Sequence, residues 1–127
     1  MTPAALAAAA RGVLHEPPAA ASGGWPRMVA VLTRQALEQA LAEFWASVPG
    51  AAGVSRCTYR TQFACLPFYL NAATAREAEY LWATLSEACH YHAYELAPTA
   101  AELTSWLDAV SGLAEAMSTE GELPDAG

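Results

Sequence analysis

Residues 26–47, PRMVAVLTRQALEQALAEFWAS, form the longest amphipathic pattern in the chain and indicate its fold class. The large apolar side chains of this stretch recur at helical spacing. These side chains belong to Met28, Leu32, Leu37, Leu41, Phe44 and Trp45. Ala36 and Ala40 extend the same face, and Pro49 with Gly50 follows the pattern. We therefore predict one long helix over residues 26–47, with a single buried stripe and Arg34 and Glu38 paired on its polar side.

Further segments with helical patterns lie on both sides of this stretch. Residues 3–14 are rich in alanine and are followed by two prolines. Residues 55–70 form a third predicted helix, which Asn71 ends. Pro67 lies inside that pattern and predicts a kink or break near Cys65, because proline lacks the N–H that a helix interior uses.

The last two predicted helices begin at capping boxes. In such a box the side chains of a Thr and of a Glu three residues later accept hydrogen bonds from each other's backbone N–H groups. One box is Thr74 with Glu77, and the other is Thr99 with Glu102. Apolar residues at steps of three and four follow each box, so each is predicted to start an amphipathic helix.

No strand pattern and no internal repeat interrupts these segments, so we predict an all-α fold, an antiparallel bundle of about five helices. An N-terminal helix with a flexible linker is expected over residues 1–24, the bundle over residues 25–117, and a disordered acidic tail over residues 118–127. Three aromatic side chains either fill the core, which we favour, or form a dimer face, and they are Trp45, Trp82 and Trp106.

The charge balance of the chain is acidic, with 13 Asp and Glu residues, six arginines, no lysine and a net charge of −7. Nucleic-acid binding depends on basic side chains that neutralise phosphates, so RNA is disfavoured as a partner. No apolar run approaches the roughly 18 residues of a membrane span, and residues 4–10 lack the cationic start of a signal peptide. We expect a cytoplasmic bacterial protein outside the membrane, with free thiols at its three cysteines.

Residues 89–95, CHYHAYE, concentrate the chemically competent side chains at the end of the fourth predicted helix. His90 and His92 suit general acid–base work because histidine titrates near neutral pH. A histidine at a helix C-terminus also serves as a cap that the helix dipole favours, and both interpretations stay open. Tyr94 and Glu95 lie in the following loop, where we expect Tyr94 to pack on the bundle and Glu95 to face solvent.

A metal site would use Cys89, His90 and His92, together with Cys57 or Cys65. Structural zinc sites have four ligands at recognisable spacing, such as paired C-x-x-C, and the chain contains no such pattern. Neighbouring residues of one helix also point apart, which disfavours Cys89 and His90 as a catalytic pair. We expect no metal and no cofactor.

Two segments, RQALE at residues 34–38 and LSEACHYH at residues 85–92, precede the start of the last helix at Pro98 and Thr99. On these segments, residues 25–117 resemble the HEPN superfamily of prokaryotic helical domains. The resemblance implies a homodimer with one composite cleft. In active members it implies a metal-independent ribonuclease, often a toxin paired with a nucleotidyltransferase-like antitoxin. A histidine would activate the ribose hydroxyl, and an arginine four to six residues earlier would stabilise the charged phosphorane.

The arginine and histidine pair of that superfamily is incomplete in this sequence. His92 stands at the position of the family's histidine, with His90 as a second candidate. The arginine expected about five residues before His92 falls at Glu87, whose carboxylate repels phosphate. Arg34 or Arg60 from another helix, or an arginine across a dimer, would have to replace it.

The favoured hypothesis is therefore a non-catalytic HEPN-like module that dimerises and binds a ligand or partner protein in a groove beside His90 and His92. The alternative is a metal-independent ribonuclease of a toxin–antitoxin or defence system that uses His92 or His90, so enzymatic activity stays open. The candidate ligand contacts are Tyr94, Glu87, Arg34 and Glu95.

Overall fold

The computed structural model describes residues 1–19, 23–91 and 95–121, and these residues contain five α-helices, short 3-10 turns and no strand. The helices are α1 (Pro3–His15), α2 (Trp25–Ser47), α3 (Tyr59–Cys65), α4 (Ala72–Cys89) and α5 (Ala100–Gly121). The predicted all-α architecture is confirmed. None of the helices in the described part of the chain is long and apolar enough to cross a membrane.

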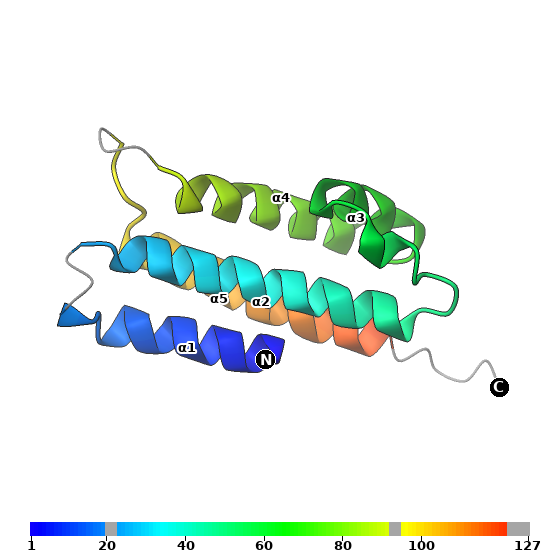
Figure 1. The fold of residues 1–127 in the computed structure, drawn as a ribbon, viewed down its shortest axis with the longest axis horizontal. Coiled ribbons are helices and arrows are strands. Elements are labelled where there is room, and N and C mark those ends of the chain that lie inside the picture. Colours follow the sequence, from blue (N-terminus) through cyan, green and yellow to red (C-terminus); the bar gives the residue numbers. More distant parts are fainter. Residues whose placement is uncertain (20–22, 92–94, 122–127) are drawn as a thin grey trace.

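The four long helices form a bundle in which successive helices run in opposite directions (Figure 1). α2 and α5 run parallel to each other and lie between α4 on one side and α1 on the other, while α3 packs beside the first part of α4. α1 belongs to the segment predicted as an N-terminal helix with a linker. It contacts both α2 and α5 and buries Ala7 and Ala10 against them.

α2 is the central helix, because α1, α4 and α5 all pack on it. Of the residues predicted for its buried stripe, Leu37, Leu41, Phe44 and Trp45 are buried. The prediction is wrong for Met28, which is 40% exposed. Because α1, α4 and α5 surround α2, its buried face is wider than one stripe and also includes smaller residues such as Val29. Met28 lies on the part of α2 that no other helix covers.

Trp45 joins the end of α2 to the segment that follows. Its side chain is buried, and its indole Nε1 donates a hydrogen bond of 3.1 Å to Oε1 of Gln62 on α3. The amide Nε2 of Gln62 donates to the carbonyl oxygen of Cys57 at 2.7 Å. The core position predicted for Trp45 is confirmed, whereas Trp82 and Trp106 are half-buried and pack against the core from its edge.

The third predicted helix, residues 55–70, divides into shorter pieces. A 3-10 turn, η2 (Val54–Arg56), comes first, and α3 begins after Thr58, whose hydroxyl oxygen accepts a hydrogen bond from the N–H of Thr61 at 3.2 Å. The predicted break near Cys65 is confirmed, since α3 ends there and continues as the 3-10 turn η3 (Leu66–Phe68). Pro67 lies in that turn, where its missing N–H is tolerated.

The start of α4 corrects the sequence analysis. Asn71, predicted to end the preceding helix, is the N-cap of α4, and its Oδ1 accepts hydrogen bonds from the N–H groups of Ala73 at 2.9 Å and Thr74 at 3.4 Å. Thr74 therefore lies inside the first turn, and the predicted capping box of Thr74 with Glu77 is wrong. Asparagine is a strong N-cap. Alanine has the highest helix propensity, so Ala72 and Ala73 extend α4 toward its N-terminus.

The start of α5 follows the prediction. The backbone N–H of Thr99 donates to Oε1 of Glu102, and the N–H of Glu102 donates to Oγ1 of Thr99, both at 3.1 Å. The end of α5 does not follow it, because residues 118–121, predicted as part of a disordered tail, continue the helix. Met117, the last residue of the apolar pattern, is buried, and the helix continues past it to Gly121.

Replacing a capping residue distinguishes the two boxes. Thr99→Ala removes a side-chain acceptor for an orphan N–H of α5 and is expected to lower the free energy of unfolding by about 1 kcal/mol. Thr74→Ala removes no such acceptor and is expected to leave it within about 0.5 kcal/mol. Urea titrations followed by circular dichroism measure both values. Equal losses in the two variants would contradict the assignment of the caps.

Candidate functional site

The end of α4 holds the first group of predicted site residues. His90 is the C-cap of the helix, with its backbone N–H donating to the carbonyl oxygen of Glu87 at 3.0 Å. The side chains of His90, Glu87 and Glu95 are all exposed. The predicted catalytic residue His92 and the predicted ligand contact Tyr94 both lie outside the described residues.

An arginine that the sequence analysis did not name contacts this end of α4. Nη2 of Arg27, in the first turn of α2, donates a hydrogen bond of 2.9 Å to the carbonyl oxygen of Tyr91. Its guanidinium carbon also lies 4.6 Å from the centroid of the Tyr91 ring, a cation–π distance. Tyr91 follows His90 directly. No local pattern connects residues 64 positions apart, so only the packing of α2 against α4 reveals this contact.

Arg34, a predicted ligand contact, is occupied within the bundle. Its Nε lies 3.7 Å from Oε2 of Glu38, and the same oxygen accepts a hydrogen bond of 3.1 Å from Nε1 of Trp82 on α4. The side chains of Arg34 and Glu38 are only 24% and 16% exposed. The predicted pair exists, but it lies in the contact between α2 and α4 rather than on a solvated face.

Among the described residues, two buried side-chain atoms have no hydrogen-bond partner, Nε of Arg34 and Oγ of Ser86 on α4. The separation of 3.7 Å between Arg34 and Glu38 is longer than a hydrogen bond. A half-buried guanidinium beside a carboxylate loses part of its hydration, and the paired charge compensates for that loss. We therefore interpret Arg34 as a structural residue held by Glu38. Arg60, the other substitute considered for the missing arginine, lies on α3, beside the opposite end of α4 from His90 (Figure 1).

The cysteines differ in exposure. Cys89 is buried, as expected of a small apolar side chain, but Cys65 is half-buried and Cys57 is exposed. Burial raises the pKa of the Cys89 thiol, an effect that the nearby charge of Arg34 opposes. The thiol is therefore held in its protonated form, which is a poor nucleophile and a poor metal ligand. Among the described residues, which do not include His92, no three His, Cys, Asp or Glu side chains gather as metal ligands.

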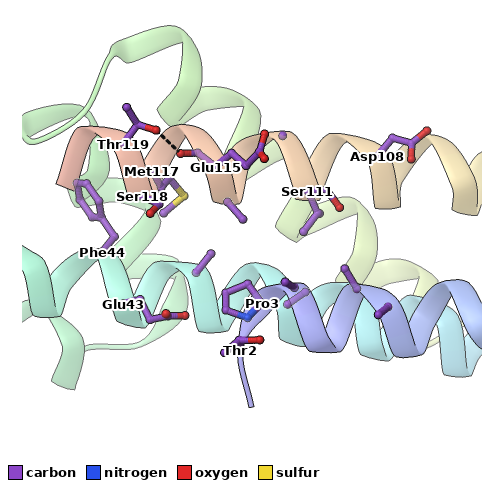
Figure 2. A pocket seen from close by; sticks show the side chains of 18 of the residues that line it. Thr2, Pro3, Glu43, Phe44, Asp108, Ser111, Glu115, Met117, Ser118 and Thr119 are labelled. Carbon is purple, nitrogen blue, oxygen red and sulfur yellow. Dashed lines mark hydrogen bonds between the residues drawn. The ribbon is translucent and has the colours of Figure 1, made fainter. Parts of the chain in front are cut away.

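A large hollow lies on another part of the bundle, along α1, α2 and α5 (Figure 2). We call it the α1–α5 groove, and its volume is about 1140 Å³. It is lined by residues 2–4, 7, 8 and 11 of the α1 segment, 36, 40, 43, 44 and 47 of α2, and 108, 110–112, 114, 115 and 117–119 of α5. Glu87, Arg34 and Glu95, the predicted ligand contacts that the structure describes, are not among them.

The lining of the α1–α5 groove combines small and apolar side chains with polar and charged ones. Ala7, Ala36 and Ala40 are buried along α1 and α2. Gly112 on α5 is exposed, and a Cβ added there would meet no atom within 4 Å. Phe44 also borders the groove (Figure 2). In the sequence, these small residues indicated only that the segments form helices. The groove results from the position of several of them on facing helices.

Thiol labelling tests the burial of the cysteines. Iodoacetamide at a limiting concentration is expected to alkylate Cys57 first and Cys89 last, because Cys89 is buried and protonated in the folded chain. Mass spectrometry of the digested protein identifies the labelled positions. Early alkylation of Cys89 in folded protein would contradict its burial in the cluster that also holds Val29, Ala30 and Leu107.

The burial of Cys89 also predicts how the free energy of unfolding changes with pH. Because folding raises the pKa of Cys89, the unfolded chain loses this proton at a lower pH than the folded chain. The free energy of unfolding should therefore decrease as pH rises through the range between the two pKa values. Cys89→Ala should show a smaller decrease than the parent chain, and an identical decrease would show that the thiol makes no contribution.

Comparison of the chain with models of protein families, with curated proteins and with solved structures gives no match.

Proposed function

We propose that this chain is a non-catalytic helical module that binds a partner protein by accepting one of its helices in the α1–α5 groove. The observation that carries the proposal is the groove itself, a hollow of about 1140 Å³ bordered by three helices. That volume lies above the roughly 300–1,000 Å³ of small-molecule pockets. Its helical walls suit the recognition mode in which an amphipathic helix lays its apolar face into a groove.

The side chains of the groove support a helix as the occupant. Ala7, Ala40 and Gly112 are small enough to let another helix approach closely. Phe44 and Met117 also line the groove but are buried and offer little surface of their own. Adjacent helices pack with their axes about 8–10 Å apart, and the shortest separations require small side chains at the contact. A partner helix with larger apolar residues would therefore fill the spaces that the alanines and the glycine leave.

Within this proposal, the resemblance to the HEPN superfamily concerns the fold and the choice of partner. The all-α bundle agrees with such a fold, and a nucleotidyltransferase-like antitoxin is the partner that the resemblance suggests. The homodimer that it implies would use a surface outside the α1–α5 groove. Light scattering at micromolar concentration tests the homodimer separately, because a partner helix can bind a monomer as well as a dimer.

A pair of glycine variants tests the groove. Gly112→Leu places a branched side chain on the groove wall, whereas Gly12→Leu places the same side chain on the exposed face of α1, and a Cβ at either position meets no atom within 4 Å. Helical peptides selected from a displayed library against the parent chain are expected to bind Gly12→Leu normally. They should bind Gly112→Leu about tenfold or more weakly, because overpacking costs about 1–3 kcal/mol.

Fluorescence anisotropy with the selected peptides measures these affinities, and circular dichroism verifies that both variants fold. Peptides that bind equally to the two variants would place the binding surface elsewhere. A library that yields no binding peptide would remove the proposal.

Ribonuclease activity is the second candidate, and the contact between Arg27 and Tyr91 favours it. The guanidinium has five N–H donors, and the hydrogen bond to Tyr91 uses Nη2. Arg27 therefore lies beside Tyr91, the residue that follows His90. It comes from α2, whereas the arginine that the resemblance implies would stand on α4 at the position of Glu87. In this proposal His90 or His92 acts as the general base, and Arg27 stabilises the charge that develops on the phosphate.

This candidate predicts metal-independent RNA cleavage that depends on Arg27. Arg27→Ala and His90→Ala are each expected to lower the cleavage rate about 100-fold or more, as removal of an electrostatic or acid–base group does. Arg56→Ala, an exposed arginine on η2, is the matched control and should keep the parent rate. Cleavage of labelled RNA in EDTA measures the rates. An inactive parent chain, or a rate insensitive to Arg27→Ala, would eliminate the candidate.

A further inference from the structure

We infer, on the basis of the proposed helix-binding function, that the partner helix is cationic, with lysines or arginines flanking its apolar face. The open end of the α1–α5 groove, where α2 and α5 terminate, carries two exposed carboxylates, Glu43 on α2 and Glu115 on α5. Both side chains are drawn on the groove in Figure 2, from opposite walls. A basic side chain on a bound helix would therefore find an acidic one on either side.

The backbone adds negative potential at the same end. α2 ends at Ser47 and α5 at Gly121, and Ser47 and Thr119 both line the groove. A helix C-terminus carries about half a negative charge, which a basic residue in the last turn usually offsets. Neither helix has a basic residue in its last turn. The N-terminus of α1, which begins at Pro3 beside Glu43 (Figure 2), carries the opposite half charge, so one of the two helix ends is left to add to the charge of the carboxylates.

The opposite end of the groove does not offset this charge. Arg11 on α1 is the one basic residue among the described groove residues, and its Nη2 lies 2.7 Å from Oδ1 of Asp108 on α5. The lining thus holds one base and three acids, Asp108 together with Glu43 and Glu115, which leaves a net charge of −2. Because Arg11 is paired, the unpaired charge is concentrated at the open end.

Charge also decides between possible occupants. A second copy of this chain carries a net charge of −7 and would bring like charges toward Glu43 and Glu115. Phosphates of a nucleic acid would be repelled in the same way. A cationic amphipathic helix fits both parts of the surface, since its apolar residues face the exposed Ala8 and Gly112 while its basic residues reach the two carboxylates.

Three synthetic peptides of about 15 residues, or about four helical turns, test this inference. All share one face of Leu and Ala, and their polar face consists of Lys, Gln or Glu. The Lys peptide is expected to bind the parent chain about tenfold more tightly than the Gln peptide, as two rim charge pairs allow at low salt. The Glu peptide should bind most weakly. Fluorescence anisotropy at two salt concentrations gives the dissociation constants.

Charge-reversal variants show where the attraction arises. Glu43→Lys and Glu115→Lys should each weaken binding of the Lys peptide severalfold and strengthen binding of the Glu peptide. Glu79→Lys is the matched control, because Glu79 is exposed on α4 and does not line the groove. It changes the net charge by the same amount and should leave the affinities within about twofold.

The outcomes separate this inference from the proposed function. If Gly112→Leu blocks all three peptides but the Lys and Gln peptides bind the parent chain equally, the groove binds helices without selecting cations, and only the inference fails. If Gly112→Leu affects no peptide, the proposed function fails with it. If Glu79→Lys weakens binding as much as Glu43→Lys, the attraction comes from the net charge of the chain, and the inference is overturned. Concentration-dependent self-association that Gly112→Leu abolishes would make a second copy the occupant and would also overturn it.

Discussion

The enclosure of α2 by α1, α4 and α5 is the constraint on which the rest of the molecule depends. Full burial of a Leu or Phe side chain stabilises a fold by about 1.5–3 kcal/mol, and α2 buries Leu37, Leu41 and Phe44 in the principal core. α5 also contacts α1 and α4, but less extensively than α2 does. Thr33 and Gln62, the two polar residues that are buried in the described part of the chain, both make hydrogen bonds that compensate for lost hydration.

Unequal helix lengths and small side chains together explain the α1–α5 groove. α1 has 13 residues and α2 has 23, so α1 is about 20 Å long and α2 about 35 Å at 1.5 Å per residue. α1 therefore covers only part of the surface that α2 and α5 present. Where it does cover that surface, Ala7 and Ala8 face a wall that includes Gly112, and side chains of this size do not fill the space between the helices.

The polar residues of the bundle fall into two regions with different consequences. Between α2 and α4, Arg34, Glu38 and Trp82 contact one another, and the partial burial of the charges makes their arrangement part of the fold. Along the α1–α5 groove, Glu43 and Glu115 are exposed and contribute little to stability. Their charge instead acts on whatever approaches the groove, because electrostatic complementarity governs the choice of partner and the rate of encounter more than affinity.

The sequence by itself determined the helices, because helical spacing, prolines and caps act over a few residues. The break at Cys65 before Pro67 and the capping box of Thr99 with Glu102 were both predicted in this way. Local signals did not determine the first residue of α4, because both Asn71 and Thr74 can cap a helix. Asn71 is the N-cap, and it makes the helix longer than a cap at Thr74 would.

Only the tertiary structure decided which residues of different helices meet. The contact of Arg27 with Tyr91, the partial burial of Arg34 and the α1–α5 groove all depend on how the helices are rotated about their axes and how far they overlap. An alanine that favours a helix and an alanine that lines a groove look the same in a sequence. Their difference arises from packing between distant segments, which residue spacing along one helix does not encode.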